Sequence, residues 1–203
     1  MGFLDFLKRF SNKEVKVEEF TLEGINKQIG FWSKKILVTI TTGLEELNKI
    51  LDEEKGKALE NAEKLLKAEL KNPNIPERAK HIMEGNRKMY VQRVERFLET
   101  VSLPEDFKEL LEFCSSFNDS LNNFARDTTK SYQVLNEFFI SETGEVAHNL
   151  KRINDLIKKS KDLVEKSNIL ESKLLNNKLE EVNQRIKLEK ELQIKINQKE
   201  NLL

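Results

Sequence analysis

Apolar residues recur at intervals of three and four through long stretches of this chain, and few residues interrupt them. The clearest run consists of Phe107, Leu110, Cys114, Phe117, Leu121, Phe124, Thr128, Ser131, Leu135 and Phe138. This spacing is the seam of a coiled coil. The chain has three prolines and seven glycines in 203 residues, so it has little turn chemistry to connect many short elements. The sequence therefore predicts an all-α fold built from a few long helices.

Three groups of helix-breaking residues divide this helical body. Two prolines lie in residues 72–76, and Ser102-Leu-Pro-Glu105 is a capping box with proline in its first turn. At the second group either the helix restarts or a nearly continuous helix kinks, and we expect the kink. Gly144 is expected to break the chain a third time. The predicted helices are residues 21–71, residues 76–140 with a break near 102–104, and residues 145–200.

Helices of matched length joined by short turns favour antiparallel packing. We therefore expect residues 21–203 to form an elongated antiparallel three-helix coiled-coil bundle with a kinked second helix. Trp32 shares the seam of Ile25, Ile29 and Ile36, which predicts that it is a core residue. Cys114 lies on the seam of the second helix and is expected to be a buried structural thiol. So slender a bundle leaves apolar positions over, so we expect a homodimer.

The first ten residues, Met1-Gly-Phe-Leu-Asp-Phe-Leu-Lys-Arg-Phe10, predict a short amphipathic helix. Turned at about 100° per residue, the large apolar side chains fall within one arc of roughly 160°. These side chains are Phe3, Leu4, Phe6, Leu7 and Phe10. The protein's own core, a partner or a bilayer boundary would each bury them. The stretch from Ser11 to Glu19 is polar and lacks helical periodicity. We expect residues 11–20 to be a linker that frees the segment to move, so we favour insertion into a membrane.

One such helix is a marginal membrane anchor, because ordering its residues costs about 1–2 kcal/mol each. Stable attachment needs a second signal, and basic residues near an anionic surface supply about 1 kcal/mol apiece. The predicted lipid head-group residues are Lys8, Arg9, Lys13, Arg87, Lys88, Arg93, Lys151, Arg152, Lys158 and Lys159. A homodimer would add avidity by presenting two anchors at once. The expected partner is therefore an anionic membrane surface, with a protein partner as an open alternative.

Little in the sequence favours catalysis or ligand binding. His81 and His148 are isolated, without a cysteine or second histidine at metal-ligand spacing. Phosphate loops, nucleophile elbows and HExxH runs are absent from the sequence. Basic and acidic residues balance at 35 each, which argues against nucleic acid as a partner. We expect a non-enzymatic protein without metal, cofactor or small-molecule substrate, cytoplasmic and peripheral on the inner face of the membrane.

The amphipathic opening residues, the three long segments and the break at residues 102–105 together resemble the BAR-domain superfamily of the N-BAR type. The resemblance implies a rigid curved dimer that senses or remodels membrane curvature. The arrangement is also similar to phage-shock protein A and ESCRT-III proteins, which join an N-terminal amphipathic helix to long helices and polymerise on membranes. A third hypothesis is a coiled-coil adaptor or scaffold whose N-terminus docks on a protein.

Overall fold

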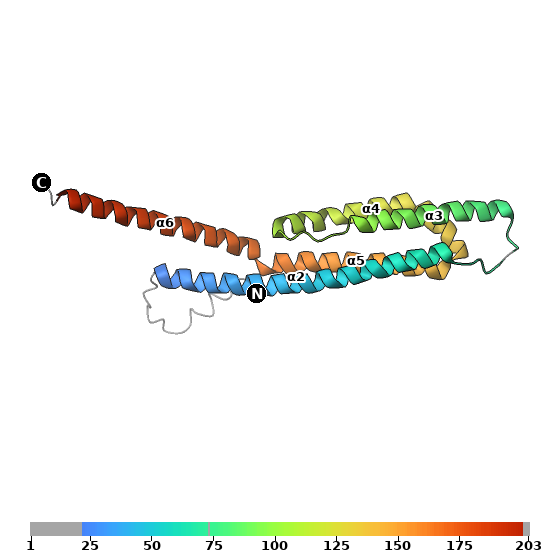
Figure 1. The fold of residues 1–203 in the computed structure, drawn as a ribbon, viewed down its shortest axis with the longest axis horizontal. Helices are drawn as coiled ribbons and strands as arrows, with labels where there is room; N and C mark the ends of the chain where they lie inside the picture. The colour runs from blue at the N-terminus through green and yellow to red at the C-terminus, as the bar shows by residue number, and fades with distance from the viewer. Residues whose placement is uncertain (1–21, 73, 201–203) are drawn as a thin grey trace, which may run out of the picture. The chain divides into compact units, whose positions relative to one another are not determined.

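The structure is a computed structural model that describes residues 22–72 and 74–200 (Figure 1). All regular structure in these residues is helical, which confirms the all-α prediction. The helices are α2 (Leu22–Lys67), α3 (Glu77–Glu99), α4 (Phe107–Phe138), α5 (Ile140–Ser167) and α6 (Ile169–Glu200). The chain forms two compact units. Residues 36–170 make up the larger unit, and residues 1–35 with 171–203 make up the smaller.

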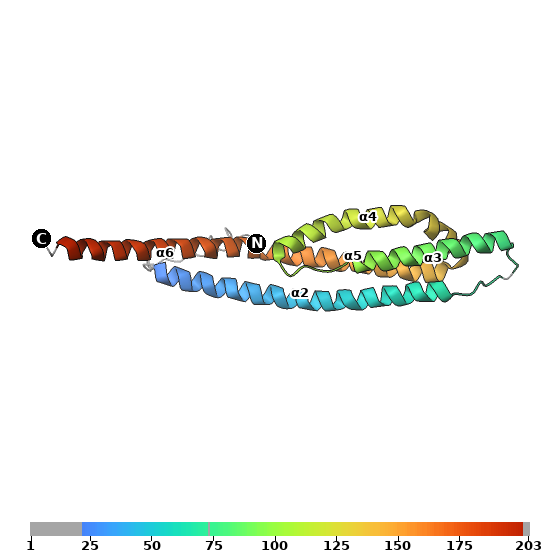
Figure 2. The same cartoon turned by 45° about the horizontal axis from the view of Figure 1, so that its top comes forward.

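In the larger unit, α2, α3, α4 and α5 run alternately in opposite directions (Figures 1 and 2). Ring contacts fix the reversal between α3 and α4. The ring centres of Tyr90 and Tyr132 lie 6.2 Å apart, and those of Phe97 and Phe117 lie 5.8 Å apart. Phe97 comes after Tyr90 in α3, whereas Phe117 comes before Tyr132 in α4. The predicted single kinked helix over residues 76–140 is therefore wrong. It is an antiparallel pair joined by residues 100–106.

The break itself was expected near residues 102–104, but its consequence was not. Asp106 caps α4, because its carboxylate accepts hydrogen bonds from the backbone N–H groups of Lys108 at 2.8 Å and Glu109 at 3.2 Å. Because Asp106 satisfies the first N–H groups of α4, this helix can begin anew and need not continue along the axis of α3. Apolar residues recur at the same spacing whether the second helix continues after a kink or runs back after a turn. The sequence pattern could therefore not distinguish a kink from a reversal.

The core of the larger unit takes buried side chains from all four helices. Its largest fully buried residues include Leu51, Leu65, Met83, Tyr90, Leu98, Leu110, Leu135, Ile153 and Ile157. The predicted seam of residues 107–138 faces this core, with Phe107, Leu110, Cys114 and Phe117 buried and Phe124 half-buried. The prediction of a buried Cys114 is confirmed.

The predicted third helix over residues 145–200 is helical as expected, but it begins earlier, at Ile140, and is divided at Asn168 into α5 and α6. Gly144 lies inside α5, and the chain instead breaks between α4 and α5 at Phe139, whose φ is −136°. A glycine costs a helix only about 1 kcal/mol relative to alanine, so a well-packed helix tolerates it. A second break occurs at Asn168, which adopts the left-handed conformation with φ 54° and ends α5. Asparagine visits this region more readily than most residues.

In the smaller unit, residues 22–35 of α2 run antiparallel to α6. The Asn26 Nδ2 group donates to Asn183 Oδ1 at 2.9 Å, and the Ser33 and Ser172 hydroxyl oxygens lie 2.6 Å apart. Two helix segments cannot enclose a large side chain as four can. Trp32 is therefore 54% exposed, and the prediction that it is a core residue is wrong.

Candidate functional site

The predicted membrane-inserting residues lie outside the residues that the structure describes. They are Phe3, Leu4, Phe6, Leu7 and Phe10, with Lys8, Arg9 and Lys13 among the predicted head-group contacts. Their role stays a prediction. The structure does describe the other predicted head-group residues, on α3 and α5.

The side chain of Arg87 is buried and joins α3 to α2. Its Nη1 group donates to the backbone carbonyl of Ala68 at 2.6 Å and to that of Leu65 at 3.5 Å, at the carboxyl end of α2. Its guanidinium also pairs with Glu84 on the same helix and stacks on the ring of Phe139. Carbonyl groups at a helix C-terminus lack intrahelical partners, so a buried cation there satisfies them. These contacts direct Arg87 away from solvent and from lipid.

The other two predicted arginines on α3 and α5 also have partners within the protein. Arg93 is half-buried and donates through Nη1 to the backbone carbonyl of Asp127 on α4. Arg152 lies on α5 with its Nη2 group 3.2 Å from a carboxylate oxygen of the buried Glu54. The four predicted lysines on these helices, in contrast, are exposed: Lys88, Lys151, Lys158 and Lys159.

The exposed lysines of α3 and α5 lie on helices that are not neighbours. Arg87 joins α3 to α2, and the aromatic contacts of Phe97 join α3 to α4. Cys114 joins α4 to α5 by a Sγ hydrogen bond to the Ile157 carbonyl at 3.6 Å, and Glu54 joins α5 to α2. Figure 1 shows α3 and α4 on one side of the larger unit and α2 and α5 on the other. The structure does not bring the two groups of lysines together on one face.

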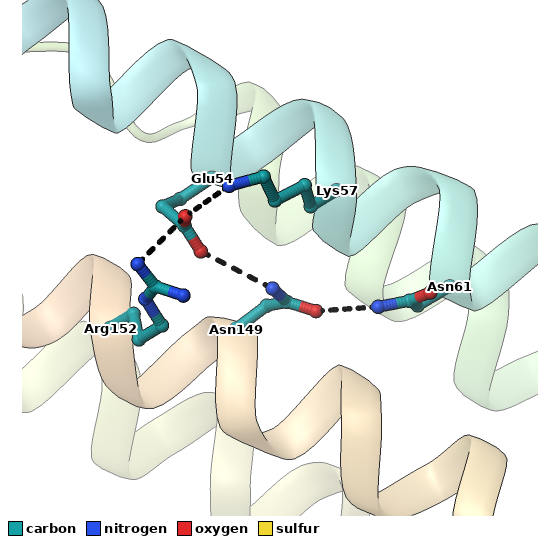
Figure 3. A network of polar contacts seen from close by, with 5 residues as sticks. All are labelled: Glu54, Lys57, Asn61, Asn149 and Arg152. Carbon is teal, nitrogen blue, oxygen red and sulfur yellow. Dashed lines mark hydrogen bonds and ion pairs between the residues drawn. The ribbon is translucent and has the colours of Figure 1, made fainter.

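A buried carboxylate organises the contact between α2 and α5 (Figure 3). Glu54 is 1% exposed, and its Oε1 atom lies 2.7 Å from Lys57 Nζ and 3.2 Å from Arg152 Nη2. Its Oε2 atom accepts from Asn149 Nδ2 at 3.3 Å, while Asn149 Oδ1 accepts from Asn61 Nδ2 at 2.8 Å. A charge can remain buried here because both of its oxygens are paired.

Burial raises the pKa of the Glu54 carboxyl, but the hydrogen bonds from Lys57 and Asn149 and the charges of Arg152 and Lys57 outweigh it. The net result is a pKa below the ordinary value of 4.5. Glu54 is therefore ionised at neutral pH. Its cationic and amide donors would repel a metal ion, so the network fits a structural role between two helices. Among residues 22–72 and 74–200, no group of three or more metal-ligating side chains is present.

Sequence reasoning missed an exposed aromatic pair in the first half of α2. Phe31 is 65% exposed and Trp32 is 54% exposed. Their ring centres lie 5.8 Å apart in an edge-to-face arrangement. Lys35 Nζ lies 5.5 Å from the Trp32 ring centre. The missed signal was the composition of residues 24–44, which hold Lys27, Lys34 and Lys35 and no acidic residue.

Helix α6 also displays apolar side chains. Those exposed are Leu170, Leu174, Leu175, Val182, Leu188, Leu192, Ile194 and Ile196. Leu188, Leu192 and Ile196 follow one another at intervals of four, so they form a stripe along one side of the helix. A stripe of this kind fits a second helix better than it fits water.

An open groove of about 510 Å³ lies in the larger unit beside the connection between α3 and α4. It is lined by Thr41, Leu44, Glu45, Asn48, Leu103, Pro104, Glu105, Phe107 and Leu110. These residues offer two carboxylates among apolar and uncharged groups, which gives no nucleophile paired with a base. The groove therefore adds no argument for catalysis.

Comparisons with known proteins give no match, whether to a family model, to a curated protein or to a solved structure. None of the described helices has a stretch apolar enough, over enough length, to cross a bilayer.

Proposed function

We propose that this protein binds the surface of anionic membranes as a peripheral protein. The sequence of the opening decapeptide carries the proposal, because a helix over it would gather Phe3, Leu4, Phe6, Leu7 and Phe10 on one side. These side chains insert among lipid head groups, and Lys8, Arg9 and Lys13 meet the lipid phosphates. The expected location is the cytoplasmic face of the membrane.

The helical body supplies the second contact that a marginal anchor needs. Of the predicted head-group residues, Lys88, Lys151, Lys158 and Lys159 keep their role, because their side chains are exposed. Arg87 is left out, since its guanidinium is bound to α2 carbonyls. Arg93 and Arg152 are also left out, because the first is bonded to a carbonyl and the second to Glu54.

We also propose that the protein is a homodimer. The exposed stripe of Leu188, Leu192 and Ile196 on α6 supports self-association, since helices bury such stripes against one another. A dimer carries two opening segments, which raises avidity without any new contact. Light scattering at micromolar concentration tests this, and a monomer would remove the avidity argument.

The N-BAR-like mechanism, in which wedged helices and a stiff dimer sense or remodel curvature, stays a prediction. Polymerisation in the manner of phage-shock protein A and ESCRT-III proteins is the alternative. The third alternative is a coiled-coil adaptor or scaffold whose N-terminus docks on a protein, and the exposed apolar side chains of α6 offer such a partner a further surface. Electron microscopy of the protein with vesicles separates the three, because they give tubules, coated filaments and unchanged vesicles respectively.

Cosedimentation with vesicles tests membrane binding directly. The full chain is expected to sediment with phosphatidylcholine vesicles that contain phosphatidylserine. Phe6→Glu and deletion of residues 1–10 are each expected to remove most of this binding. Phe20→Glu, outside the decapeptide, is the matched control and is expected to sediment like the full chain. Full binding by the deletion variant would refute the role of the decapeptide.

A further inference from the structure

We propose that the exposed face of α2 around Phe31 and Trp32 is a second lipid-binding surface, on which Trp32 enters the head-group region of an anionic bilayer. The inference rests on the proposed membrane binding and names the part of the helical body that makes the contact. It differs from the predicted head-group residues, which lie in the opening segment and on α3 and α5.

Phe31 and Trp32 are exposed on α2, and the position of each on the helix explains why. Asn26 and Ser33 turn toward α6 and hold the two helices together. At about 100° per residue, Phe31 and Lys35 fall on the side of α2 roughly opposite those two residues. Lys27 and Trp32 lie on either side of this pair, Lys34 lies at the border with the α6 contact, and Trp32 is more than half exposed. The α6 contact therefore leaves this face of α2 uncovered.

The chemistry of the face matches a bilayer boundary. A tryptophan ring is amphipathic and is enriched where head groups meet acyl chains. Lysine side chains extend along an apolar surface and leave their ammonium groups in water, where lipid phosphates lie. Lys35 already sits over the Trp32 ring, so cation and ring meet the surface together.

Charge selects a lipid surface over other occupants. Residues 24–44 contain three lysines and no acidic residue, although acidic residues make up 35 of the 203 in the chain. A second helix of this chain would bring mixed charges against the face, as α6 does with its alternating Lys and Glu residues. An anionic bilayer meets every lysine of the face with the opposite sign, and each contributes about 1 kcal/mol near the surface.

Trp32 reports on this contact directly, because it is the single tryptophan of the chain. The full chain is mixed with phosphatidylcholine vesicles with and without phosphatidylserine, and cosedimentation is measured in the same samples. With phosphatidylserine, Trp32 emission is expected to shift to the blue. It is also expected to be quenched by lipids brominated near the head group and protected from iodide in the water.

Two variants test the residues around the tryptophan. Lys34→Glu with Lys35→Glu is expected to weaken vesicle binding by at least about tenfold, because two attractive charges become repulsive. Its control is Lys130→Glu with Lys178→Glu, two exposed lysines elsewhere, expected to change binding by less than about twofold. Phe31→Gln is expected to abolish lipid quenching of Trp32. Ile140→Gln is its control, because Ile140 is 67% exposed and Phe31 65%.

The outcomes separate this inference from the proposed function. Sedimentation of the full chain with Trp32 left open to iodide and unquenched by brominated lipid would overturn the α2 surface and leave membrane binding standing. A chain that fails to sediment would overturn both. Blue-shifted Trp32 emission without vesicles, at concentrations where light scattering shows a dimer, would assign the face to a second copy and overturn the lipid contact.

Discussion

The guanidinium of Arg87 on α3 lies 5.1 Å from the ring centre of Phe139, the residue between α4 and α5. The same guanidinium donates to the carbonyls of Leu65 and Ala68 at the end of α2. One side chain thus ties the end of the first helix to the turn between the last two helices of the larger unit. In the sequence, Arg87 is a charged residue beside Lys88, but it also continues the 3-4 spacing of Met83, Tyr90 and Val94, which marks the buried side of α3.

Replacing Arg87 by alanine is expected to lower the free energy of unfolding by about 2–4 kcal/mol, because two buried carbonyls lose their donor and the Phe139 ring its cation. Urea unfolding followed by circular dichroism measures the change. The neighbouring variant Lys88→Ala removes an exposed charge and is expected to cost less than about 0.5 kcal/mol. Equal effects of the two variants would contradict the role given to Arg87.

Glu54→Gln is expected to destabilise the protein by about 1–3 kcal/mol at neutral pH, since Lys57 and Arg152 lose a buried counter-charge. The pKa of Glu54 is lower in the folded protein than its ordinary value of 4.5. Its carboxylate therefore stabilises the fold above that value, and this stabilisation is lost as pH falls through the folded pKa. The difference between wild type and variant is expected to shrink in acid.

Unfolding by urea at neutral pH and in acid measures both stabilities. Glu53→Gln, at the exposed adjacent position, is the control and is expected to change stability by less than about 0.5 kcal/mol at either pH. A Glu54→Gln effect that stays constant into acid would show that the loss is one of packing and not of charge.

Burial raises the pKa of the Cys114 thiol to about 11, with the charge of Lys161 opposing the shift. The thiolate is the reactive form, so the native thiol is expected to react with Ellman's reagent at least about 100-fold more slowly than after unfolding. In a Cys114→Ser background, Ser116→Cys places a thiol at an exposed position two residues away and is expected to react fast. Fast reaction of native Cys114 would contradict its burial.

The long-range periodicity of the sequence predicted much of the fold, but not the direction of its helices. The seam from Phe107 to Phe138 faces the core as expected, because burial follows directly from apolar spacing. The reversal at residues 100–106 depends on which helices pack together, and that information is shared among distant residues such as Tyr90 and Tyr132. Local pattern does not contain it.

The candidate site was harder to predict for the same reason. Trp32 fits the seam of Ile25, Ile29 and Ile36, so spacing alone assigned it to a core. Whether a seam is enclosed depends on how many helices cover it, and only the contact with α6 is described along this part of α2. Arg87 and Arg152 show the opposite error, because they were predicted to contact lipid and instead bind groups inside the protein. Arg87 donates to the carbonyl of Ala68, and Arg152 pairs with the buried carboxylate of Glu54.

Asn168 stores a small strain at the end of α5, since its φ of 54° is left-handed. Asn168→Ala is expected to lower the free energy of unfolding by about 1 kcal/mol, because a Cβ without a compensating polar group disfavours this conformation. Asn168→Gly is expected to stay within about 0.5 kcal/mol of wild type. Thermal unfolding compares both with Asn177→Ala in α6, which is expected to be neutral or slightly stabilising. An alanine as stable as glycine at residue 168 would argue against the left-handed turn.

Because α3 and α5 are not neighbours, we expect the exposed lysines of one of these helices to contact the membrane and not those of both. Helix α5 exposes Lys151, Lys158 and Lys159, whereas α3 exposes one of the predicted lysines, Lys88. A flat bilayer touches one side of the larger unit, so the helix with more exposed lysines is expected to face it. Lys158→Glu with Lys159→Glu should then weaken vesicle cosedimentation by about tenfold.

Lys88→Glu with Arg96→Glu reverses the same number of exposed charges on α3 and should leave binding within about twofold of wild type. Equal losses from the α3 and α5 variants would mean that both helices meet lipid at once, as they would if two copies of the chain presented different sides. Equal retention by both would leave the contact to the opening segment and α2, because neither exposed group of lysines would then lie at the membrane.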